Sequence, residues 1–193
     1  WVTPSFSTGT AAHRTIQKAL LNAIVEYIQI DAFVLSWYTE RKSIRIQIDD
    51  PIILNILEKV GLGENSPYEI VPLYITLPDL YLPSVMVILR RKDKKIPAFI
   101  LGVQGDMNIR NAVLRGIFEA TAIISMNVYN TIYDPKKVIF ANTESAFADL
   151  DTNVLYYGTP IHDDVIDGIL HKMTGKTVPL SFFESSSKST TLQ

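Results

Sequence analysis

Two long stretches of the chain space their apolar residues as amphipathic helices do. The second stretch runs from Asn108 to about Tyr129. In the first, residues 11–38, apolar side chains recur every three or four positions, at Ile16, Leu20, Ala23, Ile24, Tyr27, Ile28 and Leu35. The pattern predicts two long helices separated by about 70 residues of other structure.

Shorter elements are expected between and after these helices. Ile44, Ile46 and Ile48 alternate with polar residues, which predicts a strand. A short helix should follow, capped by Asp50 and ended by Gly61. Further extended segments are predicted at residues 69–77, 85–89, 96–103 and 138–140, and a last helix at residues 162–173, ended by Gly175. The fold class is therefore mixed α/β (α+β).

The composition narrows the class of protein. The 193 residues are 47% hydrophobic and 20% charged, which excludes a disordered chain. The absence of cysteine excludes a disulfide framework, a thiolate nucleophile and a zinc site built on sulfur. A net charge of −2 gives no general attraction to nucleic acid or anionic lipid. We expect a folded, cytoplasmic domain.

The ends of the chain differ from its middle. The sequence opens at Trp1 without a signal peptide, so we expect a processed end with a preceding segment missing. Residues 1–180 are expected to form the domain, and the Ser/Thr-rich residues 181–193 a flexible tail. No membrane span is predicted, because the best candidate, residues 19–38, is interrupted by Asn22, Glu26, Gln29 and Asp31.

The two predicted helices resemble each other. Gly9 precedes Glu26 by 17 residues, and Gly102 precedes Glu119 by the same 17. Residues 19–26 (ALLNAIVE) and 112–119 (AVLRGIFE) share Ala, Leu, Ile and Glu at matching places. We infer an internal repeat covering about residues 5–60 and 98–130, with the two helices placed alike about one core.

Both helices carry a polar stripe. Asn22, Glu26 and Gln29 share one face of the first. Arg115 and Glu119 lie one turn apart on the second. Because an unpartnered buried charge costs several kcal/mol, such stripes face solvent, each other or a polar ligand. They are therefore the solvated sides of two amphipathic helices, or a structural ion pair, or the walls of a cleft that holds a metal and a phosphate.

Other motifs carry less information. The DDxxD spacing of magnesium sites occurs at Asp163, Asp164 and Asp167. The alternative explanation is that the helix dipole stabilises acidic residues at a helix N-terminus. The basic run 90–95 is either a solvated hairpin tip or a contact for phosphate or a partner. His13 is either a cap or a ligand contact, and His162 and His171 are expected at the surface. No glycine loop of the nucleotide-binding folds occurs.

Several segments resemble the YcaO-like family. Its small-residue glycine segment and following helix are similar to residues 7–12 (STGTAA), 19–21 (ALL) and 26–33 (EYIQIDAF). Its later helix resembles Ala112, Arg115, Gly116 and Glu119, and its strand pair resembles residues 82–89 and 99–103. Its late D-L-D-x-x-V-x-x-Y stretch is similar to residues 149–157 (DLDTNVLYY). Residues 26–38 look closest to the streptolysin S-associated D-type (SagD-like) proteins, and the chain corresponds to the second half of a family domain.

The resemblance implies an activity. Such proteins use ATP and Mg²⁺ to cyclise Cys, Ser or Thr of a ribosomal precursor peptide into azolines, by phosphorylating the backbone amide oxygen. The implied partners are an E1-like leader-binding protein, the precursor peptide and a flavin dehydrogenase of the same bacterial pathway. Separately, the apolar composition predicts association, because half a domain exposes core that the missing part or a second copy, as in a homodimer, would cover. The resemblance implies that Glu26 binds metal, and that Glu26, Gln29, Arg115, Glu119, Arg14 and Lys18 form the nucleotide site.

The match has gaps at the site. The family's second carboxylate on the first helix is Gln29 here, and the adjoining arginine is Ile30. Arg14 and Lys18 stand where the family often has an asparagine and a glutamate. Three hypotheses follow: a cyclodehydratase subunit, which as an isolated fragment would be inactive; a docking scaffold with a degenerate nucleotide site; and an unrelated α/β domain with structural stripes.

Overall fold

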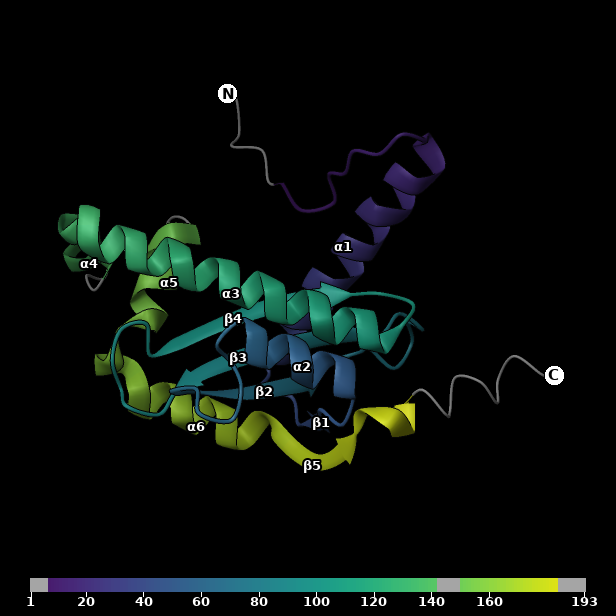
Figure 1. The fold of residues 1–193 in the computed structure, drawn as a ribbon. Coiled ribbons are helices and arrows are strands. Elements are labelled where there is room, and N and C mark those ends of the chain that lie inside the picture. Colours follow the sequence, from purple (N-terminus) through teal and green to yellow (C-terminus); the bar gives the residue numbers. More distant parts are fainter. Residues whose placement is uncertain (1–6, 142–149, 184–193) are drawn as a thin grey trace, which may run out of the picture.

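The computed structural model describes residues 7–141 and 150–183 (Figure 1). The strands are β1 (Ser43–Gln47), β2 (Tyr68–Tyr74), β3 (Ser84–Arg91), β4 (Phe99–Gly105) and β5 (Thr174–Pro179). The helices are α1 (Ile16–Tyr38), α2 (Pro51–Lys59), α3 (Ile109–Tyr133), α4 (Pro135–Ala141), α5 (Leu150–Gly158) and α6 (Asp163–Met173), with a 3₁₀ turn at Pro160–His162. The predicted mixed α/β class is confirmed.

The strands form one sheet in the order β4-β3-β2-β1-β5. Strands β1 to β4 pair antiparallel, and β5 pairs parallel with β1. Strand β4 is therefore an edge strand, and its outer side faces no further strand among the described residues. This free edge carries the candidate site.

Helices cover both faces of the sheet. On one face, α2 and α3 pack against alternate residues of β3 such as Val85 and Val87. On the other, Ala32 of α1 and Ile166 of α6 pack against Met86 and Ile88 of β3. Figure 1 shows α2 and α3 together on the near face, while the N-terminal part of α1 runs out of the domain. Because β3 is buried on both faces, it lacks the polar alternation of a half-exposed strand.

The helix starts follow local sequence. Asp50 caps α2 by accepting from the N–H groups of Ile52 (2.8 Å) and Ile53 (3.0 Å), as predicted. Asn108 caps α3 in the same way through the Arg110 N–H. Helix α1 begins at Ile16 after its cap Thr15, later than the predicted start at residue 11.

Two local predictions are wrong. Residues 138–140 lie in α4 instead of a strand, since three apolar residues are too few to distinguish the two. Gly175 does not simply end the last helix, because it belongs to β5, which the sequence analysis missed. A Cβ at Gly175 would lie 2.7 Å from the Ser43 carbonyl oxygen, so the close approach of β5 to β1 requires glycine there.

Residues 181–183, which the sequence analysis assigns to the tail, contact the domain. The Phe183 ring lies 4.9 Å from that of Tyr74, and the Ser181 N–H donates to Asp49 at 3.1 Å. The rest of the expected tail lies outside the described residues. The internal repeat stays a prediction, with α1 and α3 both against β4 but on opposite faces of the sheet.

Helix α1 is long and apolar enough to cross a membrane by length and composition, which the sequence analysis did not expect. Gln29, Ala32 and Ser36 in its C-terminal half are nevertheless buried against the domain. In this fold the helix is therefore an element of the domain, with one face left exposed.

Candidate functional site

Side chains from α1 and α3 close the free edge of β4. The N–H groups of Val103 and Gly105 point away from β3, and each needs an acceptor. The Gly105 N–H donates to Gln29 Oε1 of α1 at 2.6 Å, and the Val103 N–H donates to Glu119 Oε2 of α3 at 2.8 Å. The two polar stripes predicted from sequence therefore meet at one strand end, from opposite faces of the sheet.

Glycine brings α3 within reach of this edge. A Cβ at Gly102 would lie 2.4 Å from the Gly116 carbonyl oxygen and 2.8 Å from the Ala120 nitrogen. Both neighbours are backbone atoms that cannot move aside cheaply. The close contact of β4 with α3 places Glu119 one turn beyond Gly116, over the strand end.

Within the described part of the chain, hydrogen bonds reach only one oxygen of the Glu119 carboxylate. Its Oε2 accepts from the Val103 N–H and from Gln104 Nε2 at 3.1 Å. Burial raises the pKa of Glu119, although the two donors and the Arg115 charge oppose this rise, and the Glu26 charge adds to it. The charge of Glu26 on α1 therefore acts on the Glu119 carboxylate, although the two residues come from different helices.

Arg115 supplies a cation one helical turn before Glu119. Its side chain is 55% exposed, and its Nη1 lies 3.3 Å from Asp106 Oδ2. Glu26 is half-buried on α1. Carboxylates from two helices next to an accessible guanidinium form a suitable arrangement for a divalent cation and a phosphate group.

The structure does not bring all predicted site residues together. Arg14 and Lys18 lie at the exposed start of α1, and Lys18 is two turns, about 12 Å, before Glu26 along the helix. Gln29 is buried, and its side-chain oxygen is already bound to Gly105. The set thus divides into a cluster of Glu26, Gln29, Arg115 and Glu119 and two outlying cations.

The cluster fits a magnesium nucleotide in part. Within residues 7–141 and 150–183 no three His, Cys, Asp or Glu side chains gather in a metal-binding group. The Oε1 of Gln104 is buried without a hydrogen-bond partner in the same part of the chain, beside the Glu119 carboxylate. Two carboxylates and an unpaired amide oxygen provide ligands of the kind that Mg²⁺ prefers.

Sequence reasoning missed Gln104 and Asp106. Gln104 donates to Glu119, and Asp106 pairs with Arg115. Both follow Gly102 at the end of an otherwise apolar strand. Polar residues at the end of a strand are the signal that would have found them.

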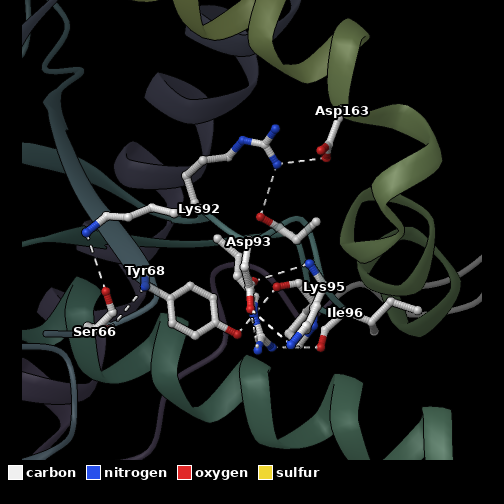
Figure 2. A network of polar contacts seen from close by, with 11 residues as sticks. Ser66, Tyr68, Lys92, Asp93, Lys95, Ile96 and Asp163 are labelled. Atoms are coloured by element: carbon white, nitrogen blue, oxygen red, sulfur yellow. Dashed lines mark hydrogen bonds and ion pairs between the residues drawn. The ribbon is translucent and has the colours of Figure 1, made fainter.

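The DDxxD motif has a structural role in this fold. Asp163 is buried, and its Oδ1 accepts from Arg90 Nη1 at 2.8 Å, while Asp167 Oδ1 accepts from Arg90 Nε at 3.0 Å. Figure 2 shows the Asp163 carboxylate pointing at a guanidinium group, which is that of Arg90 near the end of β3. The two acids anchor α6 to the β3–β4 hairpin, so they are engaged by arginine instead of a metal.

The basic run forms the tip of this hairpin. Arg91 Nε donates to Asp93 at 2.6 Å, and the guanidinium lies 5.6 Å from the centre of the Tyr68 ring. Lys92 Nζ reaches the Ser66 carbonyl oxygen at 3.4 Å (Figure 2). Residues 92–95 are exposed, as the hairpin interpretation predicts, whereas Arg90 and Arg91 at the end of β3 are largely buried.

The histidines lie away from the cluster. His13 and His171 are exposed. His162, expected at the surface, is half-buried and stacks on Tyr156 with ring centres 3.7 Å apart. Its burial lowers its pKa.

Comparison with known proteins identifies the family. The family described as YcaO cyclodehydratase, ATP- and Mg²⁺-binding, matches residues 1–163. The chain belongs to the YcaO family. A search of curated proteins gives no match to this YcaO sequence.

Solved structures agree with this assignment. A chain of the E. coli microcin synthetase McbBCD complex with pro-MccB17 bound is 16% identical, with a TM-score of 0.67 over 91% of this chain and 41% of its own. YcaO from Methanopyrus kandleri, bound with AMPPCP and Mg²⁺, is 15% identical, with a TM-score of 0.65 over 94% of this chain and 42% of its own. The heterocyclase TruD is 25% identical, with a TM-score of 0.54 over 62% of this chain and 17% of its own. The chain therefore spans less than half the length of each of these YcaO-like structures.

Proposed function

We propose that this protein is a component of an ATP-dependent cyclodehydratase that forms azoline rings from Cys, Ser or Thr of a ribosomal precursor peptide. The family description supports a heterocycle-forming role, as does the likeness to a heterocyclase and a microcin synthetase. The observation that carries the proposal is that the polar stripes of α1 and α3 meet at the free edge of β4, through Gln29 and Glu119.

Each residue of the cluster has a role in this proposal. Glu26 and the unengaged Oε1 of Glu119 hold the divalent cation. Arg115, which is largely exposed, exchanges Asp106 for phosphate oxygens, to which its planar fork is suited. Gln29 positions the end of β4 by accepting from the Gly105 N–H. ATP, when bound, supplies the phosphoryl group that makes an amide oxygen a good leaving group.

The remaining predicted residues have an outer role. Arg14 and Lys18 are exposed near the start of α1, and we assign them to the solvent side of the site, where they contribute positive charge toward a polyphosphate. The expected partners are an E1-like leader-binding protein, the precursor peptide and a flavin dehydrogenase. The resemblance to a chain from a multi-protein synthetase with its precursor bound supports this expectation.

A docking scaffold is the second candidate, with the streptolysin S-associated D-type proteins as its nearest type. The observation that favours it is the engagement of Gln29 and of Glu119 Oε2 in backbone hydrogen bonds. An amide at position 29 and isoleucine at position 30 also remove a charge and a phosphate contact that the family pattern supplies. In this role the fold holds the precursor and partners without turning over nucleotide.

Calorimetric titration of Mg²⁺–ATP into the full-length protein separates the two candidates. For the enzyme we expect binding that weakens at least about tenfold in Arg115→Ala, because a charge-assisted hydrogen bond contributes about 1.5–3 kcal/mol. Arg45→Ala is the matched control, since Arg45 is another partly exposed arginine paired with an acid, Glu69, on β2. Its affinity should stay unchanged.

The outcomes are distinct. Binding lost in Arg115→Ala and kept in Arg45→Ala supports the nucleotide site at this edge. No binding to the folded parent protein supports the scaffold. ADP release coupled to loss of water from the precursor, measured with the partner present, tests the cyclodehydratase step itself.

A further inference from the structure

Gln104 binds the Glu119 carboxylate from the strand that α3 covers. It lies near the end of β4, where Ile100 and Gly102 alternate with it on the face that packs against α3. Its Nε2 donates to Glu119 Oε2 at 3.1 Å, and the Val103 N–H donates to the same oxygen at 2.8 Å. Because both donors hold Oε2, the direction of the other carboxylate oxygen, Oε1, is fixed as well.

This hydrogen bond leaves the oxygen of the Gln104 amide unsatisfied. A carboxylate oxygen that already takes one N–H can only accept, so the amide NH₂ group must face Glu119 and the amide oxygen must face elsewhere. Within the described residues Gln104 Oε1 is buried and has no hydrogen-bond partner. The free energy lost at this oxygen offsets much of what the Nε2 bond contributes. Folding stability alone therefore gives little reason for glutamine at this position, and such an atom calls for a functional explanation.

The charge of the donor supplies that explanation. A lysine or arginine at position 104 could also donate to Glu119, but it would place a positive charge against the carboxylate and compete with a cation there. Serine and threonine are neutral, but their hydroxyl groups stay close to the strand backbone. The amide of glutamine is a long donor that leaves the negative charge of Glu119 intact, and its unpaired oxygen is a consequence of that choice.

The other polar contacts at this strand end also leave Glu119 Oε1 open. Arg115 acts on Glu119 through its charge, while its Nη1 lies 3.3 Å from Asp106 Oδ2. The Gln29 oxygen accepts from the Gly105 N–H. Each of these side chains is engaged elsewhere, so the contact from Gln104 decides where the free oxygen of Glu119 points.

We propose that Gln104 is a positioning residue of the nucleotide site, which aims Glu119 Oε1 at the bound cation without reducing the charge of the carboxylate. This role rests on the proposed function, because it requires a cation at Glu119. It adds a residue outside the set that the family resemblance implies. Residues that orient a metal ligand in this way typically contribute about 10- to 100-fold to metal affinity.

Calorimetric titration of Mg²⁺–ATP into the full-length protein measures the effect. Gln104→Met keeps the length of the side chain and removes the donor, so it should weaken binding about 10- to 100-fold. Gln104→Lys keeps a donor but adds a positive charge, and it should weaken binding at least as much. Gln47→Met and Gln47→Lys are the matched controls, since Gln47 is an exposed glutamine on β1, and both should bind as the parent does.

Titration with ATP in EDTA separates the cation from the phosphates. Gln104→Met should bind metal-free ATP as the parent does, because it affects only the cation ligand. Gln104→Lys should bind it at least as well, because the added positive charge attracts phosphate. Arg115→Ala should weaken the binding of both forms of ATP.

Urea denaturation distinguishes positioning from a structural role. Gln104→Met should leave the midpoint of unfolding nearly unchanged, since it removes the hydrogen bond and the unpaired oxygen together. A lower midpoint with the Mg²⁺–ATP affinity of the parent would show that Gln104 is structural and would overturn the inference. Failure of both Gln104 variants to fold would overturn it for the same reason.

The test also separates this inference from the proposed function. Binding of Mg²⁺–ATP that is lost in Arg115→Ala but unchanged in both Gln104 variants overturns the role of Gln104 and leaves the nucleotide site standing. Equal losses in the Gln104 and Gln47 variants overturn it too. Absence of Mg²⁺–ATP binding in the folded parent overturns both.

Discussion

Among the ion pairs of the described residues, Arg90 and Asp163 form the most buried one, and the loss of Arg90 should therefore destabilise the domain strongly. Its guanidinium donates to Asp163 at 2.8 Å and to the Ala98 carbonyl oxygen at 3.2 Å, and the Asp163 side chain is only 5% exposed. Arg90→Met keeps the length of the side chain but removes the main partner of a buried carboxylate, to which only the exposed Lys94 Nζ then remains, at 3.8 Å from Asp163 Oδ2. Breaking a buried pair in this way costs about 3–5 kcal/mol.

A matched exposed pair calibrates this number. Arg45 and Glu69 are also 2.8 Å apart, but their side chains are 33% and 46% exposed. Exposed pairs contribute about 0.2–1 kcal/mol, so Arg45→Met should cost at most about 1 kcal/mol. Both variants remove an arginine that pairs with an acid at 2.8 Å, and the pairs differ in burial and in the further bonds of Arg90 to Asp167 and to the Ala98 carbonyl oxygen.

Urea denaturation followed by circular dichroism and tryptophan fluorescence gives the two free energies. Against a typical folding free energy of about 5–15 kcal/mol, the loss in Arg90→Met should be plain. Arg90→Met combined with Asp163→Leu should recover most of it, because both charges are then replaced by apolar groups. If Arg90→Met costs no more than Arg45→Met, burial of the pair does not control its energy and the reasoning fails.

Three further predictions concern glycine and pH. Gly102→Ala should cost about 1–3 kcal/mol or more in urea denaturation, since its Cβ would lie 2.4 Å from a backbone oxygen, whereas Gly168→Ala, with nothing within 4 Å, should gain about 1 kcal/mol. The Arg110 guanidinium lowers the pKa of Asp50 from 3.8 to about 2, so the stability advantage of the parent over Asp50→Asn should shrink as pH falls through that interval and should not change above it. Burial raises the pKa of Glu119 above its ordinary 4.5, so the folded state holds that proton more tightly. The stability of Glu119→Gln relative to the parent should therefore increase as pH rises above 4.5, and pH-dependent thermal melting that shows no such trend would contradict this.

Local rules were sufficient for much of the fold. The Asp50 cap followed by Pro51 marks the start of α2, and the basic run 90–95 falls at the β3–β4 turn. These features depend on neighbours within a few residues. Strand β5 could not be predicted in this way, because TGKTVP has no apolar alternation and pairs only by lying parallel to β1.

The candidate site was predictable in its parts but not in its arrangement. Glu26, Arg115 and Glu119 stood out as polar residues in apolar helices. The bond between Gln29 and Gly105, 76 residues apart, depends on how α1 crosses the sheet edge, and no period in the sequence reports that. The pairing of Arg90 with Asp163 over 73 residues was missed for the same reason.

The closure of the β4 edge by Gln29 and Glu119 has a consequence for how the chain behaves at high concentration. An open strand edge recruits strands from other molecules and begins aggregation, and here two side-chain acceptors occupy the N–H groups that such a strand would use. Replacing Glu119 with leucine would uncover the Val103 N–H and make the protein prone to precipitate, whatever happens to its activity. Glutamine at that position keeps an acceptor, so a loss of activity there would report on chemistry instead of solubility.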